Sequence, residues 1–259
     1  MNTPLRRVAA ALLAGGMLIS LRAAAPVVPD WALPGSATHQ QVPPPAGFHR
    51  DTVTWSVPLG IFEGQSDIGG PLLPGSASFD AAHGTYTLNS ASYNIWYFRD
   101  EFRYAWKKIS GDVRLAADVD FPVVGGYGDR KAVLVIRAGL EDDAKEIMTA
   151  LHGAGLIHLA YRPEKGADLR EAFHIETPVV GQPQGTGKTR IGIEKHGNQF
   201  VLLFGVAGEP MHRVGPPVTL KFDEPFYVGI GFCSHIPDKS DTAVLSKVEL
   251  DNSAPKAAK

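Results

Sequence analysis

The chain has 259 residues, 44% hydrophobic and 20% charged, with a formal net charge of -2 at pH 7. This length fits one or two domains, and the hydrophobic content is sufficient for a buried core. The near-neutral charge argues against a nucleic-acid partner, because nucleic-acid binders carry a basic surplus on one face. The single cysteine, Cys233, excludes an internal disulfide, so the fold must be held by its core.

Residues 1–25 have the composition of an export signal. The pair Arg6-Arg7 precedes an apolar run at 8–21 and small residues at 23–25. The run is shorter than a membrane-spanning helix requires, and the arginine pair leaves a twin-arginine export route open. We therefore expect a periplasmic or secreted protein with no transmembrane segment once the signal is removed.

Residues 26–75 predict an extended lead-in. This segment is rich in Pro and Gly, with three consecutive prolines at 43–45, and contains few runs that could form regular structure. Its aromatic residues, including Trp31, Phe48 and Trp55, favour partial packing on the domain that follows. A disordered tether is the alternative, above all before Phe48.

Residues 76–250 predict an all-β domain. Short alternating runs separated by turns, without a long amphipathic helix, are typical of a sandwich of two antiparallel sheets. The expected strands cover residues 76–80, 85–89, 94–98, 102–109, 113–121, 131–137, 147–152, 156–162, 173–177, 190–196, 199–206, 225–234 and 243–250. This size favours a jelly roll with one curved, ligand-facing sheet, and residues 251–259 are expected to fray.

The run from Glu146 to Arg162 predicts a β-hairpin closed by a Gly-Ala-Gly loop. In this register Glu146 lies opposite Arg162, and Ala150 lies opposite His158, on a face that also carries His152. The other face is apolar and belongs in a core. Small alanines between the polar ends predict a shallow floor, so this face is the predicted ligand site.

The strand expected at 225–234 also has a face that could contribute to a ligand site. Gly229 and Gly231 share a strand face with Tyr227, Cys233 and His235. The glycines either lower the floor on the ligand side or permit close strand packing or a bend in the sheet. The sequence leaves both interpretations open.

Four stretches of the domain carry a family resemblance. They are SYNIWYFRDEFRYAWKKISGDVRLAADV, GDRKAVLVIRAGLEDDAKE, LHGAGLIHLAYR and YVGIGFCSHIPDKSDTAVLSKVEL. They resemble a bacterial exported family, labelled TolB-like or biopolymer-transporter-like, whose domain is a concanavalin-A-like β-sandwich of unassigned function. The likeness runs from about Gly60 to Leu250. It implies the sandwich and a relation to proteins that bind or cleave glycans, and it implies no catalytic residues.

Glycan binding needs flat aromatic rings beside hydrogen-bonding groups, because a sugar has an apolar ring face and a fringe of hydroxyls. The candidate rings are Trp96, Tyr97, Trp106 and Tyr127, with Arg99, Asp100, His152, His158 and Arg162 as polar partners. Core packing is the favoured interpretation for Trp106, which alternates with other aromatic residues. The predicted ligand-binding set is His152, His158, Arg162, Glu146, Trp96, Arg99 and His235.

Glycoside hydrolysis is the enzymatic alternative, and it requires two carboxylates across a cleft, one of them protonated. The candidates are Glu101, Glu146, Glu176 and Glu194. Pairing with Arg162 is expected to lower the pKa of Glu146, which suits an ion pair better than a general acid. We therefore assign no catalytic residue.

Cofactor sites have little support in the sequence. The segment GQPQGTGKT at 181–189 approaches a phosphate-binding loop but has Gln182 where the pattern needs glycine, and no helical pattern follows. The histidines lack the close spacing of a zinc site. Asp118, Asp120 and Asp129 offer oxygens suited to calcium, although solvated strand faces are the favoured interpretation. We predict no cofactor, with calcium as the open alternative.

The leading hypothesis is an exported, non-catalytic β-sandwich that binds a carbohydrate or cell-envelope glycan on a concave sheet face. The first alternative is a glycan-active hydrolase of the concanavalin-A-like class. The second is a periplasmic interaction module whose partner is an envelope protein. Exposed aromatic rings over a polar groove would favour binding, and a flat apolar patch would favour a protein partner.

Overall fold

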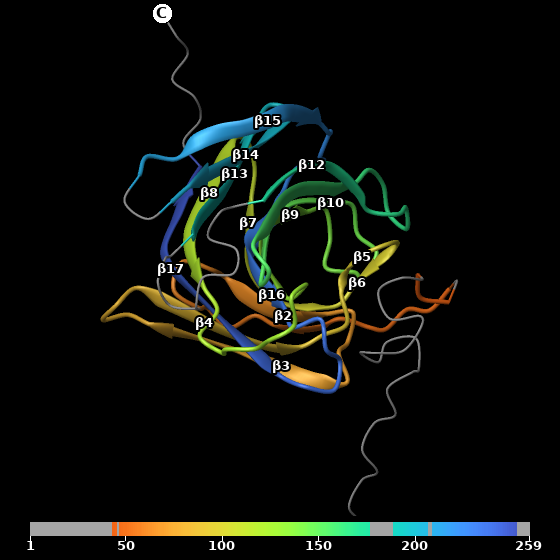
Figure 1. Cartoon of the computed structure of the whole chain (residues 1–259). Coiled ribbons are helices and arrows are strands. Elements are labelled where there is room, and N and C mark those ends of the chain that lie inside the picture. The colour runs from red at the N-terminus through yellow and green to blue at the C-terminus, as the bar shows by residue number, and fades with distance from the viewer. Residues whose placement is uncertain (1–42, 46, 177–188, 207–208, 253–259) are drawn as a thin grey trace, which may run out of the picture.

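A computed structural model describes residues 43–45, 47–176, 189–206 and 209–252 (Figure 1). Over these ranges the regular elements are β-strands, and no helix has the length and hydropathy needed to cross a membrane. The predicted export signal at 1–25 and the end of the predicted tail at 253–259 lie outside the described residues. So does residue range 181–188 of the glycine-rich loop.

The first sheet has eight antiparallel strands in the order β1-β2-β7-β16-β9-β10-β11-β12. Its strands are β1 (Val53–Trp55), β2 (Gly64–Ile68), β7 (Phe102–Ile109), β16 (Phe226–Cys233), β9 (Lys131–Arg137), β10 (Glu146–His152), β11 (Leu156–Arg162) and β12 (Arg170–Glu176). Consecutive segments of the chain are not all neighbours in this sheet, since the late strand β16 lies between β7 and β9.

The second sheet has seven strands in the order β15-β14-β13-β8-β17-β4-β3. Its strands are β15 (His212–Thr219), β14 (Gln199–Gly205), β13 (Thr189–His196), β8 (Val113–Asp120), β17 (Asp241–Asp251), β4 (Thr85–Ala91) and β3 (Leu73–Asp80). Figure 1 shows the two sheets facing each other, which confirms the predicted all-β jelly-roll sandwich.

The core between the sheets follows from strand alternation. Val113, Leu115, Ala117 and Val119 are buried on the inner face of β8, as the alternating pattern predicts. The inner faces of the other strands contribute Leu134, Ile147, Leu159, Ile193, Leu202, Val228 and Leu245. Burial of this apolar area is the main force that holds the sheets together.

Some strands differ from the sequence expectation. β1 and β2 belong to the eight-stranded sheet although they fall in the predicted lead-in. β2 has the sequence GQSDI, whose buried polar side chains find distant partners: Arg103 donates to Asp67 at 3.1 Å and to Gln65 at 2.5 Å. β15 lies where no strand is predicted, and it contains Pro216 and Pro217, which an edge strand tolerates.

The expected strand at 94–98 is a small hairpin instead. β5 (Ile95–Trp96) pairs with β6 (Arg99–Asp100) as a separate two-stranded unit. It lies on the outer face of the eight-stranded sheet, the face turned away from the seven-stranded sheet (Figure 1). A second apolar cluster forms beneath it and includes Ile95, Tyr104, Val133, Val135, Met148 and Ala160. This hairpin decides which part of the outer face is open.

The glycines of β16 serve close packing. A Cβ on Gly231 would lie 2.7 Å from the ring of Phe102, and one on Gly229 would contact the carbonyl oxygen of Ala105 on the neighbouring strand. Of the two interpretations left open by the sequence, the structure therefore supports close approach of ring and backbone over a lowered ligand floor.

Candidate functional site

The predicted β10–β11 hairpin is confirmed together with its register. Glu146 pairs with Arg162, and Ala150 pairs with His158. The loop has Gly155 at a φ of 91°, in the left-handed region that glycine adopts without strain. One face of the hairpin enters the core and the other lies on the outer face of the sheet, as the alternation predicted.

This outer face is covered, so the expectation of a shallow open floor is wrong. Glu146 and Arg162 are 0% exposed and His158 is 1% exposed. The ring of Trp96 stacks on that of His158, with centroids 5.6 Å apart and planes 16° apart. The small alanines make room for the β5–β6 hairpin, because Ile95 packs into the same apolar cluster. We call the outer face of β9, β10 and β11 the covered half.

Four charged side chains form a buried ion network under this cover: Asp100, Arg137, Glu146 and Arg162. Arg162 donates from Nη1 and Nη2 to the two oxygens of Asp100, at 2.6 and 2.7 Å. Arg137 donates to Asp100 Oδ2 at 2.6 Å and also contacts Glu146. Asp100 pairs with both arginines, so its removal would leave two buried guanidinium groups without their shared partner.

The two carboxyls of this network have opposite pKa shifts. Burial raises the pKa of Glu146 to about 7, and the charge of Asp100 acts in the same direction. The expected lowering by Arg162 is therefore outweighed. Burial acts on Asp100 as well, but Arg162 and Arg137 more than offset it and lower its pKa. Asp100 is the ionised anchor of the network.

Arg99 is also buried and ties the β5–β6 hairpin to two other segments. Its Nε donates to Asp142 Oδ2 at 3.1 Å, and its Nη2 donates to the carbonyl of Gly69 at 3.0 Å. Nη2 also lies 3.4 Å from Glu101. Arg99 therefore holds the cover in place, and only 1% of its surface is exposed.

His152 and His158 form a buried pair with ring centroids 4.9 Å apart. Nδ1 of His152 lies 3.5 Å from Asp129, and Nδ1 of His158 lies 3.5 Å from Glu171. Burial lowers the pKa of both imidazoles, that of His152 to about 3. At neutral pH both rings are neutral.

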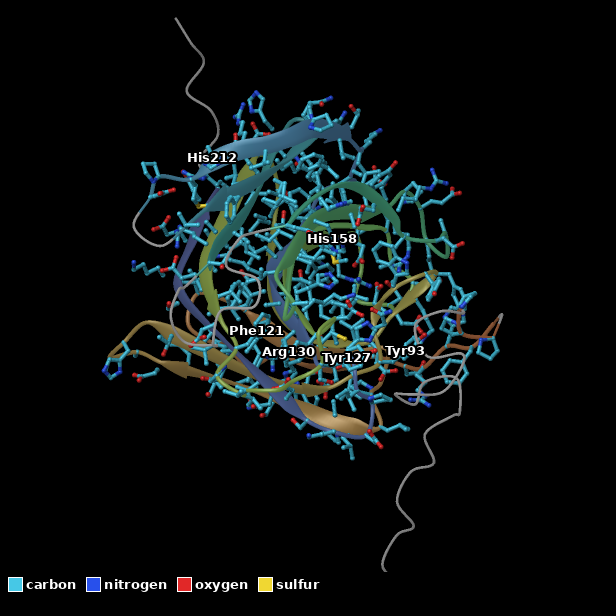
Figure 2. The ribbon with its side chains drawn as sticks, viewed as in Figure 1. Tyr93, Phe121, Tyr127, Arg130, His158 and His212 are labelled. Atoms are coloured by element: carbon cyan, nitrogen blue, oxygen red, sulfur yellow. The ribbon has the colours of Figure 1, made fainter. Side chains whose placement is uncertain are left out.

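His235 lies apart from these groups, in the segment after β16. Its backbone has a φ of 65°, and its ring centroid lies 5.4 Å from that of Tyr127 and 6.4 Å from that of Tyr93. Figure 2 labels both tyrosines together with Arg130, whose backbone N–H donates to the Tyr127 carbonyl at 3.1 Å. Only 2% of His235 is exposed. His235 therefore belongs neither to the ion network nor to the histidine pair, and a ligand role for the predicted residues stays a prediction.

The aspartates considered for calcium lie in different places. Asp118 and Asp120 belong to β8, and Asp118 receives a hydrogen bond from Arg190 at 2.8 Å. Asp129 lies beside His152 on the other sheet. Within the described ranges, no three or more His, Cys, Asp or Glu side chains are arranged to hold a metal ion.

The glutamates considered for hydrolysis are also dispersed. Glu101 and Glu146 are buried against arginines. Glu176 ends β12, and Glu194 on the seven-stranded sheet accepts from Arg213 at 2.6 Å. These positions form no acid pair across a shared cleft.

An open groove of about 860 Å³ lies on the part of the outer face that the hairpin leaves free. Its volume falls in the range of about 300 to 1,000 Å³ that is usual for ligand sites. Its lining includes His49, Arg50, Asp51, Lys108, Glu141 and Tyr227. We call this part of the sheet face the open half.

One row of side chains joins the covered and open halves. Tyr227 pairs with Lys108 on one side and with Arg137 on the other, and Glu146 pairs with Arg137 and Arg162. Side chains at paired positions share a sheet face. The row therefore begins in the groove at Lys108 and ends in the ion network at Arg162.

Tyr227 forms the aromatic part of the groove floor, and Trp106 packs behind it. The ring of Tyr227 is partly exposed and meets Trp106 edge to face, with centroids 5.1 Å apart. Trp106 is 9% exposed, which confirms its predicted packing role, and its Nε1 donates to Ser66 Oγ at 2.9 Å. It lies over Gly64, where a Cβ would collide with its ring. Lys108 Nζ lies 5.0 Å from the Tyr227 ring centroid.

The groove wall comes from the segment expected to be a lead-in. Thr52 Oγ1 donates to the Leu140 carbonyl at 2.7 Å, and His49 Nδ1 lies 3.0 Å from Asp142. Sequence reasoning missed this wall because its contacts join residues about ninety positions apart. The available signal was the parity of Tyr227, which placed its ring on the outer face.

No protein-family model and no curated protein matches this chain. The resemblance to the TolB-like family therefore stays a prediction. Among solved structures, the chain is similar to a functionally unknown protein from Saccharomyces cerevisiae, at 14% identity and a TM-score of 0.52, over 70% of this chain and 92% of that one.

A second similar structure is the GH43 protein BlXynB from Bacillus licheniformis, at 11% identity and a TM-score of 0.50. The match covers 68% of this chain but 34% of that one, so the likeness is to one part of BlXynB. At these identities the comparisons show a shared β-sandwich fold alone.

Proposed function

We propose that this protein binds a carbohydrate in the groove of the open half and catalyses no reaction on it. The observation that carries the proposal is the aromatic floor: a partly exposed Tyr227 ring backed by Trp106 in a groove of about 860 Å³. A sugar ring can stack its apolar face on such a floor.

The groove rim supplies the polar contacts that a sugar needs. Lys108 and Arg50 offer donors, and Asp51 and Glu141 offer acceptors. Acceptors and donors together suit hydroxyl groups, which both donate and accept hydrogen bonds. The mixed charge favours a neutral or weakly charged glycan over a polyanion.

The covered half contributes to this proposed function indirectly. Its ion network and histidine pair hold the β5–β6 hairpin on the sheet, which leaves the groove as the accessible part of the face. The shared fold with one part of a GH43 protein is compatible with a glycan-related role and carries no further weight.

The proposed location is the periplasm or the cell exterior, with a cell-envelope glycan as the ligand class. The basis is the signal-like composition of residues 1–25. Cell fractionation tests it, and retention of the whole protein in the cytoplasm would contradict it.

The test of binding is a glycan array followed by calorimetry with the best ligand, with product analysis after long incubation. Tyr227→Ala should weaken binding at least tenfold, because it removes the stacking platform. Arg213→Ala is the matched control, since Arg213 lies exposed on the seven-stranded sheet and should bind as the wild type does.

His158→Ala and Arg162→Ala separate the two halves. Loss of binding in folded His158→Ala protein, with Tyr227→Ala unaffected, would return the site to the covered half and contradict the groove. Reaction products would establish a hydrolase instead, and no binding to any glycan would favour an envelope-protein partner.

A further inference from the structure

Three consecutive aromatic residues lie at the tip of the β5–β6 hairpin: Trp96 ends β5, and Tyr97 and Phe98 form the turn. All three are partly exposed. We call this segment the aromatic turn. It lies beside the groove, because the ring of Phe98 meets that of His49 with centroids 5.9 Å apart and His49 lines the groove. The aromatic surface therefore continues beyond the groove.

Tyr97 has a φ of 55°, in the left-handed region. A bulky side chain is uncommon there, because this backbone conformation costs a residue other than glycine on the order of 1 kcal/mol or more. A turn that served only as a cover would be less strained with glycine at this position. A tyrosine in this strained conformation points to a use for its ring.

The surrounding structure fixes this turn firmly. The carbonyl of Tyr97 accepts from Arg162 Nη2 at 3.1 Å and from the backbone N–H of Leu169 at 2.7 Å. Arg162 is held in turn by both oxygens of Asp100. The buried ion network thus ends directly at the backbone of the aromatic turn.

Trp96 is fixed by a second contact. One face of its ring stacks on the buried ring of His158, and Lys131 Nζ lies 5.9 Å from its centroid. Rings that are already ordered lose little conformational entropy when a ligand stacks on them. Strain, buttressing and partial exposure together describe a preorganised contact surface.

We propose that the aromatic turn is a second sugar subsite that extends the groove, so that the ligand is an oligosaccharide of several units. This inference rests on carbohydrate binding in the groove. One end of the chain stacks on Tyr227, and the next units pass His49 to reach Phe98 and Tyr97.

The test is affinity as a function of chain length, measured by calorimetry with the di-, tri-, tetra- and pentasaccharide of the glycan that the array identifies. In the wild type, affinity should rise about tenfold between the shortest and longest ligands, as expected for an added stacking contact. Tyr97→Gly should abolish this rise and leave disaccharide affinity unchanged. Glycine accepts the same φ, so the turn should keep its course.

Lys247→Gly is the matched control, because Lys247 has a φ of 47° on the seven-stranded sheet. It relieves the same kind of backbone strain away from the ligand and should keep the full length dependence. An unchanged length dependence in Tyr97→Gly would overturn the subsite while Tyr227-dependent binding of the disaccharide stands. Absence of disaccharide binding would instead overturn the groove and the subsite together.

Discussion

The covered and open halves are parts of one sheet face that differ in what lies above them. On the covered half, the β5–β6 hairpin shields Glu146, Arg137 and Arg162 from water. Asp100 of this hairpin accepts hydrogen bonds from both arginines. On the open half, the same row of side chains continues as Tyr227 and Lys108 in a groove.

Alternation in a strand assigns a side chain to a face of the sheet but does not determine whether that face is accessible. Glu146 and Tyr227 occupy equivalent positions on neighbouring parts of one row. A segment distant in sequence buries Glu146 and leaves Tyr227 in the groove.

The largest effect is expected for Asp100→Ala. It leaves the guanidinium groups of Arg137 and Arg162 buried without their shared partner, which should lower the free energy of unfolding by about 3 to 5 kcal/mol. Urea denaturation measures this loss. Arg213→Ala, which breaks an exposed pair with Glu194, should cost less than about 1 kcal/mol.

A loss below about 1 kcal/mol for Asp100→Ala would show that the cover opens readily and that water solvates the two arginines. The two halves would then differ only in how often the β5–β6 hairpin is open over them. Hydrogen exchange at the backbone amides of β10 would show the same opening.

The fold could be predicted where its causes are local. The alternation of Val113 to Val119 and the short loop after His152 were sufficient to place strands and register. β2 could not be found in this way, because its polar residues are buried only through contacts with Arg103 and Trp106, which lie about forty positions away.

A second prediction uses the pH dependence of stability in the covered half. The pKa of Glu146 is raised from 4.5 to about 7, so the folded state keeps a proton that the unfolded chain releases, and stability falls as the pH rises between these values. The pKa of His152 is lowered from 6.5 to about 3, so the unfolded chain takes up the proton, and stability rises as the pH rises between these values.

Between about pH 5 and pH 6.5 these two contributions oppose each other, each by about 2 kcal/mol. Glu146→Gln should therefore make stability rise more steeply with pH than in the wild type. His152→Gln should do the reverse. Urea denaturation at both pH values measures the slopes, and parallel profiles for all three proteins would show that neither group is sealed from water.

The candidate site was predictable only in part for the same reason as the fold. The pairing of Glu146 with Arg162 follows from one hairpin, and sequence alone placed it correctly. The contact between Arg162 and Asp100 joins residues 62 positions apart, and it is this contact that closes the face. The groove wall has the same long-range origin, so the groove could not be predicted from local pattern.

A smaller effect is expected at the floor of the open half. Gly64→Ala would place a Cβ against the ring of Trp106, and this overpacking should cost about 1 kcal/mol, the low end of its usual range, because Trp106 packs on Tyr227, which lines the groove and can shift toward it. Thermal unfolding measures the loss. Ligand affinity should also fall, because Trp106 would displace Tyr227. Unchanged affinity would mean that this ring pair is not the binding platform.

The smallest effect on stability is expected for Lys108→Ala. Lys108 is exposed, and its cation–π contact with Tyr227 is worth about 0.5 kcal/mol in such a setting. Its backbone N–H still donates to Glu63 in the variant, so the strand keeps that contact. Lys108→Met is the control that retains the apolar stem and lacks the charge. If Lys108 acts only in the groove, both variants unfold at nearly the wild-type urea concentration and both weaken sugar binding. A stability loss near that of Asp100→Ala would instead place Lys108 within the ion network, and the row would then be one structural unit from end to end.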